Sequence, residues 1–163
     1  MTTRSLTAVK LDGSYKVANF GHYDGYPTGQ GIYALKFLLE KMQKEKFIKR
    51  LSQLHFAKTD KEKFESQKRQ NEFDGALILE YIQNSNDNIV VNNLKFLEDT
   101  IYCQWAYVID FDNNTFEIYS NNRTSEKYGK LNNRREFRYL NLIKIYDLNK
   151  LPTLEEFEDR FDF

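Results

Sequence analysis

The chain has 163 residues, among them 13 Phe and 11 Tyr, and its 24 basic and 24 acidic side chains give a formal net charge of zero. This length predicts a single domain over 1–163 that folds without disulfides. Balanced charge argues against a general polyanion-binding protein, so nucleic acid is a disfavoured partner. A lone cysteine, Cys103, excludes a disulfide framework and a thiolate metal cluster. With two histidines far apart, His22 and His55, we expect neither a metal nor a cofactor.

The N-terminus lacks the apolar run of a signal peptide, and no stretch approaches the ~20 apolar residues that span a bilayer. We therefore expect a cytoplasmic protein with no membrane partner.

Two short runs near the N-terminus, 5–11 and 14–20, alternate in the manner of strands, and Asp12-Gly13 between them predicts a hairpin. The apolar stripe that starts at Ile32 has helical spacing and predicts a helix that bends or restarts near residue 45. Residues 58–72 are charge-rich and predict an exposed helix or loop. Residues 73–83 are apolar enough for the core, but their period is ambiguous.

The second half predicts three strands, at 101–109, 115–120 and 137–148, with polar turns between them. The first strand is expected to place one set of side chains on a single inward face: Ile101, Cys103, Trp105, Tyr107 and Ile109. Thr153 and Glu156 form a capping box for a closing helix that buries Leu154, Phe157 and Phe161. The order of elements indicates an α+β fold, with a mainly antiparallel sheet of about five strands and helices packed on one face.

The stretch GHYDGYPTGQG, residues 21–31, holds four of the seven glycines. It joins a strand to a helix, where backbone N–H groups and the helix dipole favour an anion. The interpretation as a ligand loop uses His22, Tyr23, Asp24, Tyr26, Thr28, Gly29, Gln30 and Gly31. The backbone of 29–31 would bind phosphate, Thr28 would cap the helix, and the two tyrosine rings would stack on a base or ribose.

A structural interpretation is equally open: the stretch reverses the chain and packs Tyr23 and Tyr26 into the core. Its glycine spacing matches neither the dinucleotide-binding nor the P-loop pattern. Because Asp24 repels phosphate, it suits a ribose hydroxyl, a base edge or a positive group better. His22 beside Asp24 could act as an acid/base pair, but no nucleophile is evident, so we assign no catalytic residue.

A basic segment follows the later strands, over 121–138: Arg123, Lys127, Lys130, Arg134, Arg135 and Arg138. The simplest interpretation is a solvated loop. Folded over the glycine-rich stretch, Arg134 and Arg135 would assist phosphate binding; folded elsewhere, the segment could meet nucleic acid or an acidic partner. The acidic C-terminus gives the chain a charge polarity that also allows association, with a symmetric homodimer the commoner form.

The stretch SLTAVKLDGSYKVANFGHYDGYPTGQG resembles the N-terminus of a family of small phage and prophage proteins. The resemblance continues at IYCQWAYVIDFDNNTFEIYS and at LPTLEEFEDRF, and leaves 45–95 unmatched. It identifies no activity. It implies a protein of a phage or its bacterial host, and by association an antagonist of host defence.

From these features we expect an accessory protein that sequesters or senses a nucleotide-like small molecule of host defence signalling without catalysis. One alternative is a protein-binding inhibitor of a bacterial defence complex. Another is a hydrolase of the phosphodiesterase type that uses His22.

Overall fold

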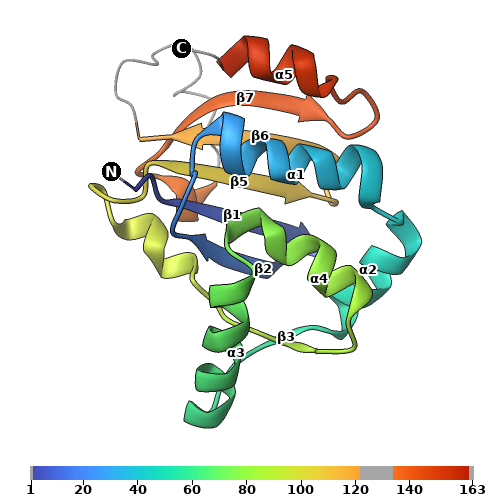
Figure 1. Cartoon of the computed structure of the whole chain (residues 1–163), viewed down its shortest axis with the longest axis vertical. Helices are drawn as coiled ribbons and strands as arrows, with labels where there is room; N and C mark the ends of the chain where they lie inside the picture. The colour runs from blue at the N-terminus through green and yellow to red at the C-terminus, as the bar shows by residue number, and fades with distance from the viewer. Residues whose placement is uncertain (1, 122–133, 162–163) are drawn as a thin grey trace.

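The computed structural model describes residues 2–121 and 134–161, and these form an α+β fold around one five-stranded sheet (Figure 1). The strand order is β2-β1-β5-β6-β7. The strands are β1 (Ser5–Leu11), β2 (Ser14–Gly21), β5 (Trp105–Asp110), β6 (Thr115–Ser120) and β7 (Asn141–Asp147). All neighbours are antiparallel except β1 and β5, which are parallel. The expected mainly antiparallel sheet is therefore confirmed, with one parallel pair at its centre.

The predicted hairpin is present, and a distant carboxylate holds its turn. Asp12 and Gly13 both have positive φ, +53° and +80°, which the Asp-Gly pair tolerates. Their N–H groups donate to the two carboxylate oxygens of Asp112, at 2.7 and 2.8 Å. Because Asp112 lies in the turn between β5 and β6, these bonds join two turns at one end of the sheet.

The first long helix begins earlier than expected and is interrupted where a bend was predicted. The helical segment consists of a π-type turn Pro27–Gly31, α1 (Ile32–Lys36) and a second π-type turn Phe37–Lys41. The chain becomes extended at Met42 and Gln43 before α2 (Lys44–Gln53) begins. Gln83 stabilises this break, because its side chain accepts from Gln43 N at 2.8 Å and donates to Lys41 O at 3.0 Å.

The remaining described helices are α3 (Asp60–Glu72), α4 (Ile78–Asn84) and α5 (Leu154–Phe161). Two short strands, β3 (His55–Phe56) and β4 (Ile89–Val90), pair in parallel beside them. A buried arginine, Arg50, ties this middle region together: it donates to Ile82 O and to groups of the turn that precedes β4. Among the described helices, none is both long and apolar enough to cross a membrane.

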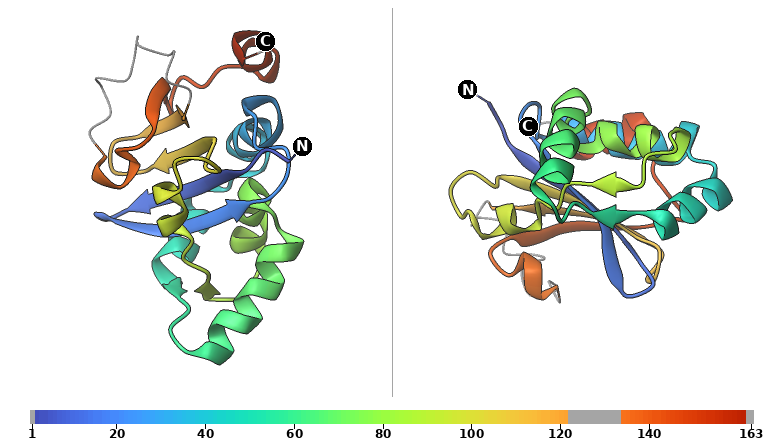
Figure 2. Two further views of the ribbon diagram at one scale, coloured as in Figure 1. Left: turned by 90° about the vertical axis from the view of Figure 1, so that its left-hand side faces the viewer. Right: turned by 90° about the horizontal axis from the view of Figure 1, so that it is seen from below.

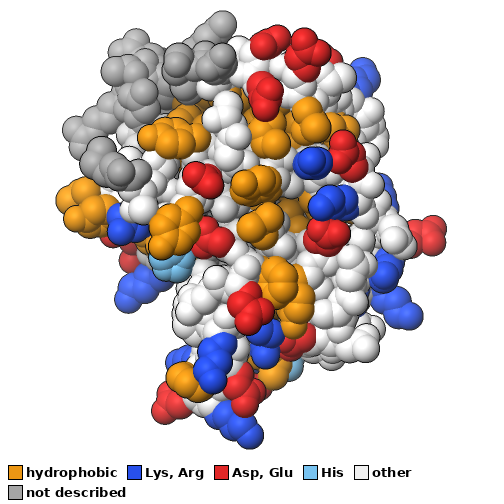
Figure 3. All heavy atoms as spheres, viewed as in Figure 1, with side chains coloured by type: hydrophobic (Ala, Val, Ile, Leu, Met, Phe, Trp, Pro, Cys, Tyr) orange, Lys and Arg blue, Asp and Glu red, His pale blue; other side chains and the backbone are white. Residues whose placement is uncertain are grey.

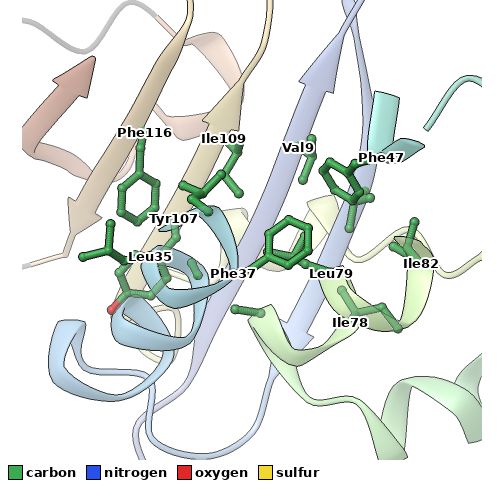
Figure 4. Close-up of a cluster of buried hydrophobic side chains, with 14 of the residues drawn as sticks. Val9, Leu35, Phe37, Phe47, Ile78, Leu79, Ile82, Tyr107, Ile109 and Phe116 are labelled. Atoms are coloured by element: carbon green, nitrogen blue, oxygen red, sulfur yellow. The ribbon is translucent and has the colours of Figure 1, made fainter. Parts of the chain in front are cut away.

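The main core lies between the sheet and the helix layer of α1, α2, α4 and α5. Figure 4 shows the part of this core that Leu35, Phe47 and Leu79 share with the sheet. Tyr107, Ile109 and Phe116 enter it from the sheet, as strand alternation requires. A smaller core covers the opposite face beneath two short 3₁₀ turns, Leu94–Glu98 and Arg135–Phe137 (Figure 2). Helical segments thus lie on both faces, while α1, α2, α4 and α5 lie on one.

One part of the expected strand at 101–109 is wrong. The strand begins only at Trp105, so Ile101 lies before it and is 71% exposed. Cys103 is fully buried, as expected for a small apolar side chain, but it belongs to the smaller core on the other face. Burial raises the pKa of its thiol to about 12.

Two capping boxes of the same kind allow a matched test. Thr153 caps α5, which buries Phe157 and Phe161, and Thr59 caps α3, which buries no large apolar side chain. We predict that Thr153→Ala lowers the free energy of global unfolding by about 1 kcal/mol. Thr59→Ala should affect it less, because α3 can fray without opening the core. Urea unfolding of both variants measures the difference, and equal losses would contradict this prediction.

Candidate functional site

The glycine-rich stretch is fixed to the protein by Asp74, which lies between α3 and α4. The Asp74 carboxylate accepts from the backbone N–H of His22 at 2.8 and 2.9 Å and from that of Tyr23 at 3.0 Å. It also lies 3.1 Å from His22 Nδ1. One carboxylate therefore satisfies two backbone donors just after β2 ends.

Gln30 makes a second connection from inside the loop. Its side chain is buried, accepts from Ala76 N at 2.7 Å and donates to Tyr23 O at 3.2 Å. Gly75 allows this approach because it has a φ of +54° and because a Cβ there would lie 2.5 Å from Gln30 Oε1. The amide of Gln30 thus joins the loop to the segment that leads into α4.

The glycines at 25 and 29 serve close packing of the loop on itself and on the sheet. A Cβ on Gly29 would lie 2.2 Å from Asp24 O, and one on Gly25 would lie 2.7 Å from Thr3 O. Gly25 N donates to Thr3 O at 3.0 Å, and the buried Tyr107 hydroxyl donates to Gly25 O at 2.6 Å. The glycine content is therefore explained by packing and backbone geometry.

The predicted phosphate donors are already used within the loop. Gly29 N and Gly31 N donate to Tyr26 O, at 2.9 and 3.3 Å, and Gln30 N donates to Asp24 O at 2.7 Å. Thr28 is exposed and does not cap the helix, which begins at Pro27 with no side-chain cap. The arrangement of these N–H groups favours the interpretation of 21–31 as a chain reversal.

The side chains that this reversal presents point outward. Tyr23 is 61% exposed and Tyr26 is 53% exposed, so the expectation that they pack into the core is wrong. Asp24 between them is exposed and has a φ of +55°, a conformation that Asp tolerates better than most residues. The result is a braced backbone that carries two solvent-facing aromatic rings and a carboxylate.

His22 pairs with Asp74 and not with Asp24, the partner considered from the sequence. Its ring also packs edge-on against Phe20, with 4.3 Å between ring centroids. Among the described residues, no group of three or more His, Cys, Asp or Glu side chains could hold a metal ion.

The described part of the basic segment does not lie beside the glycine-rich loop. Arg134 is bound to two carboxylates on the face of the sheet that carries the smaller core. Its guanidinium donates to Glu117 at 2.9 and 2.8 Å and to the buried Asp110. Glu117 also accepts from the hydroxyls of Thr115, at 2.6 Å, and Tyr119. Arg123, Lys127 and Lys130 lie outside the described residues.

These ion pairs set the titration of the carboxylates. Burial alone would raise the pKa of Asp110 and Glu117, but the hydrogen bonds and positive charge of Arg134 outweigh it and lower the pKa of both. Burial, followed by the nearby Glu117 charge, raises the pKa of the Tyr119 hydroxyl far above its ordinary value. At neutral pH the cluster therefore holds two carboxylates and one guanidinium.

A cleft of about 390 Å³ lies over this cluster. Its charged lining residues are Lys10, Arg134, Arg135, Glu117 and Glu136. Tyr15, Tyr119, Leu142 and Ile145 supply the aromatic and apolar part of the lining, with Asn113 and Thr115 beside them.

The two halves of the predicted ligand site do not meet. The loop begins where Gly21 pairs with Ser5, whereas Arg134 binds Asp110, which pairs with Lys10. Five residues of strand separate these positions, about 17 Å along the sheet. The structure brings His22 to Gly31 together in one loop and places Arg134 and Arg135 in the cleft.

Sequence reasoning missed Asp74, Lys10, Tyr15 and Glu117. Asp74-Gly75 is a turn dipeptide that could have marked a break before α4. Thr115, Glu117 and Tyr119 alternate with apolar residues, which could have marked a polar face on β6. The sequence around these residues does not indicate which distant residues they contact.

Comparison of the chain with protein-family models, with curated proteins and with solved structures finds no match.

We predict that Asp74→Ala lowers the free energy of unfolding by about 2 kcal/mol, because two backbone donors lose their acceptor. Hydrogen exchange at His22 N and Tyr23 N should accelerate. Asp24→Asn is the matched control, since Asn also tolerates a positive φ and the Asp24 carboxylate faces solvent. Unchanged hydrogen exchange at His22 N and Tyr23 N in Asp74→Ala would show that Asp74 does not hold the loop in place.

Arg134→Ala should cost about 3–5 kcal/mol of stability at pH 7, because it leaves Asp110 and Glu117 charged and buried without their cation. Their lowered pKa values mean that the native pair stabilises the fold above the unfolded-state pKa, near pH 4, and that this contribution is lost as pH falls through the folded-state values. The stability gap between wild type and variant should therefore narrow as pH falls, from the raised pKa values of the unpaired carboxylates in the variant down to the lowered pKa values in the wild type. Urea titrations at several pH values measure the difference in free energy of unfolding between wild type and Arg134→Ala. A difference that stays constant with pH would show that the lost ion pairs are not its cause.

Proposed function

We propose that this protein is a non-catalytic binding protein that recognises a partner protein with the exposed side chains of 22–26. The observation that carries the proposal is the contrast between a backbone that Asp74 and Tyr107 hold in place and two exposed tyrosine rings, Tyr23 and Tyr26. A monomeric protein gains no stability from holding such rings in solvent. Tyrosine is enriched at protein interfaces because it buries a large area at a small cost in side-chain entropy.

The surroundings of the loop favour a protein over a small molecule at this position. The N–H groups that would bind phosphate are used within the loop. Neither the cleft over Arg134 nor the hollow beside α4 is lined by residues of 22–26. Tyr33 on α1 and Leu77 before α4 are also exposed, at 38% and 43%. Figure 3 shows hydrophobic side chains spaced over this face of the molecule, with acidic side chains between them.

The resemblance to phage proteins implies the kind of partner. We propose that the exposed side chains of 22–26 bind a component of a bacterial defence complex. Binding would inhibit that complex by covering part of its surface. Asp24 next to the rings suits a basic group on that partner.

A nucleotide-like small molecule is the second candidate for the same side chains, favoured by the exposed carboxylate that lies between two exposed rings. Stacking on a tyrosine ring and a hydrogen bond to Asp24 would bind a base or a ribose. The hydrolase alternative has one supporting contact, the 3.1 Å pair of His22 and Asp74.

The first experiment places a photo-crosslinking phenylalanine derivative at position 23, 26 or 64 of the full chain in bacterial cells. Phe64 on α3 is the matched control, because it is an aromatic residue that is 63% exposed far along the chain from the loop. We expect one discrete protein adduct from positions 23 and 26 and none from 64. Equal adducts from all three positions, or none from 23 and 26, would overturn the proposal.

The second measurement separates the candidates. Any nucleotide or cyclic nucleotide detected by native mass spectrometry or by a thermal-shift screen should bind wild type and Tyr23→Ala/Tyr26→Ala equally well. A shift of several degrees that is lost in Tyr23→Ala/Tyr26→Ala would favour the small molecule instead. Turnover of a phosphodiester that is lost in His22→Ala, with the fold intact, would favour the hydrolase.

A further inference from the structure

The cleft over Arg134 has a volume typical of small-molecule sites, and no residue of the loop lines it. Its volume of about 390 Å³ falls within the range typical of ligand pockets, roughly 300–1,000 Å³. From the geometry of this cleft we infer that it binds a nucleoside monophosphate. This inference does not rest on the proposed function, because no residue of 22–26 lines the cleft.

The floor of the cleft is rigid and leaves little negative charge open to a ligand. Glu117 is buried and accepts four hydrogen bonds, two from Arg134 and one each from Thr115 and Tyr119. Both of its oxygens are therefore occupied. Such a satisfied network holds its side chains in place and so preorganises the walls around it.

The rim supplies cations that can reach an anion. Lys10 is half-buried and Arg135 is exposed, and neither makes an ion pair within the part of the chain that the structure describes. Across the lining and the floor beneath it, three cations face three carboxylates, Glu117, Glu136 and the buried Asp110, and Arg134 is neutralised by two of these. Lys10 and Arg135 are therefore the cations that remain for a ligand, and Lys and Arg together suit a phosphate.

The remaining lining residues suit a flat, partly apolar body attached to that phosphate. Lys10 Nζ lies 5.6 Å from the centroid of the Tyr15 ring, and the Phe137 ring is tilted against Tyr15 with 6.1 Å between centroids. Leu142 lies in the lining, and Ile145 is 45% exposed there. Tyr15 and Ile145 can contact a base, and Asn113 can both donate and accept at its edge. Inorganic phosphate alone would leave these surfaces uncovered.

The test measures binding of adenosine monophosphate, inorganic phosphate and adenosine to the full chain by calorimetry, with NMR shift mapping of the bound site. We expect the monophosphate to bind about tenfold more tightly than either part, with shifts at Lys10, Tyr15 and Ile145. Lys10→Ala and Arg135→Ala should each weaken it about tenfold, the loss of one charge-assisted hydrogen bond. Both side chains lie at the rim, so circular dichroism should show an intact fold.

Lys144→Ala and Arg160→Ala are the matched controls, because these cations lie over Tyr146 and Phe161 and do not line the cleft. They should bind as wild type does. Shifts confined to 22–26, equal affinity for inorganic phosphate and the monophosphate, or no binding at about 1 mM ligand would each overturn the inference. None of these results bears on the crosslinks from positions 23 and 26.

Discussion

The carboxylate of Asp74 is the contact on which the arrangement of this end of the molecule depends. It lies where β2 ends, the glycine-rich loop starts and the segment before α4 begins, and it accepts from the backbone of His22 and Tyr23. Without an acceptor at this position, the part-buried N–H of His22 would have no protein partner, and the exposed N–H of Tyr23 would be left to solvent. The loop therefore has a fixed backbone even though few of its side chains pack against the core.

The same solution is repeated along β2, which is an edge strand of the sheet. Phe20 N donates to the side chain of Asn93 at 3.1 Å, and Phe20 O accepts from Gln70 at 2.6 Å. Asn19 reaches the other way and donates to Phe73 O and Gly75 O, both at 2.9 Å. Side-chain amides thus take the place of a neighbouring strand, and they attach the edge to the segments at 70–75 and 93.

The features that sequence patterns predicted are the local ones. Alternation located β1, β2 and β6, Asp-Gly placed the hairpin, and the Thr153 capping box placed α5, because each depends on residues a few positions apart. The glycine-rich stretch was correctly placed after a strand, but its second half, 27–31, already belongs to the helical segment. Whether Tyr23 faced the core or the solvent was not predictable, because that depends on Asp74, about fifty residues away.

The ion pairs of Arg134 were likewise not predictable from the sequence. In the sequence it is one member of a basic segment, and nothing nearby indicates a partner. Its carboxylates come from the end of β5 and the middle of β6, and pairing of these strands brings them to one face. The charge of Arg134 is therefore neutralised by carboxylates of the protein itself. Lys10 and Arg135 lie beside it and make no ion pair in the described structure.

The parallel pairing of β1 with β5 has a consequence for the order in which the chain folds. Ser5 pairs with Trp105 and Lys10 with Asp110, about a hundred residues apart in every case. During synthesis the N-terminal hairpin can form early, but its inner edge stays open until β5 has left the ribosome. Such non-local pairing slows folding, because a large loop must close before the contact forms. The hairpin at the start of the chain is thus completed by a strand from the second half of the chain.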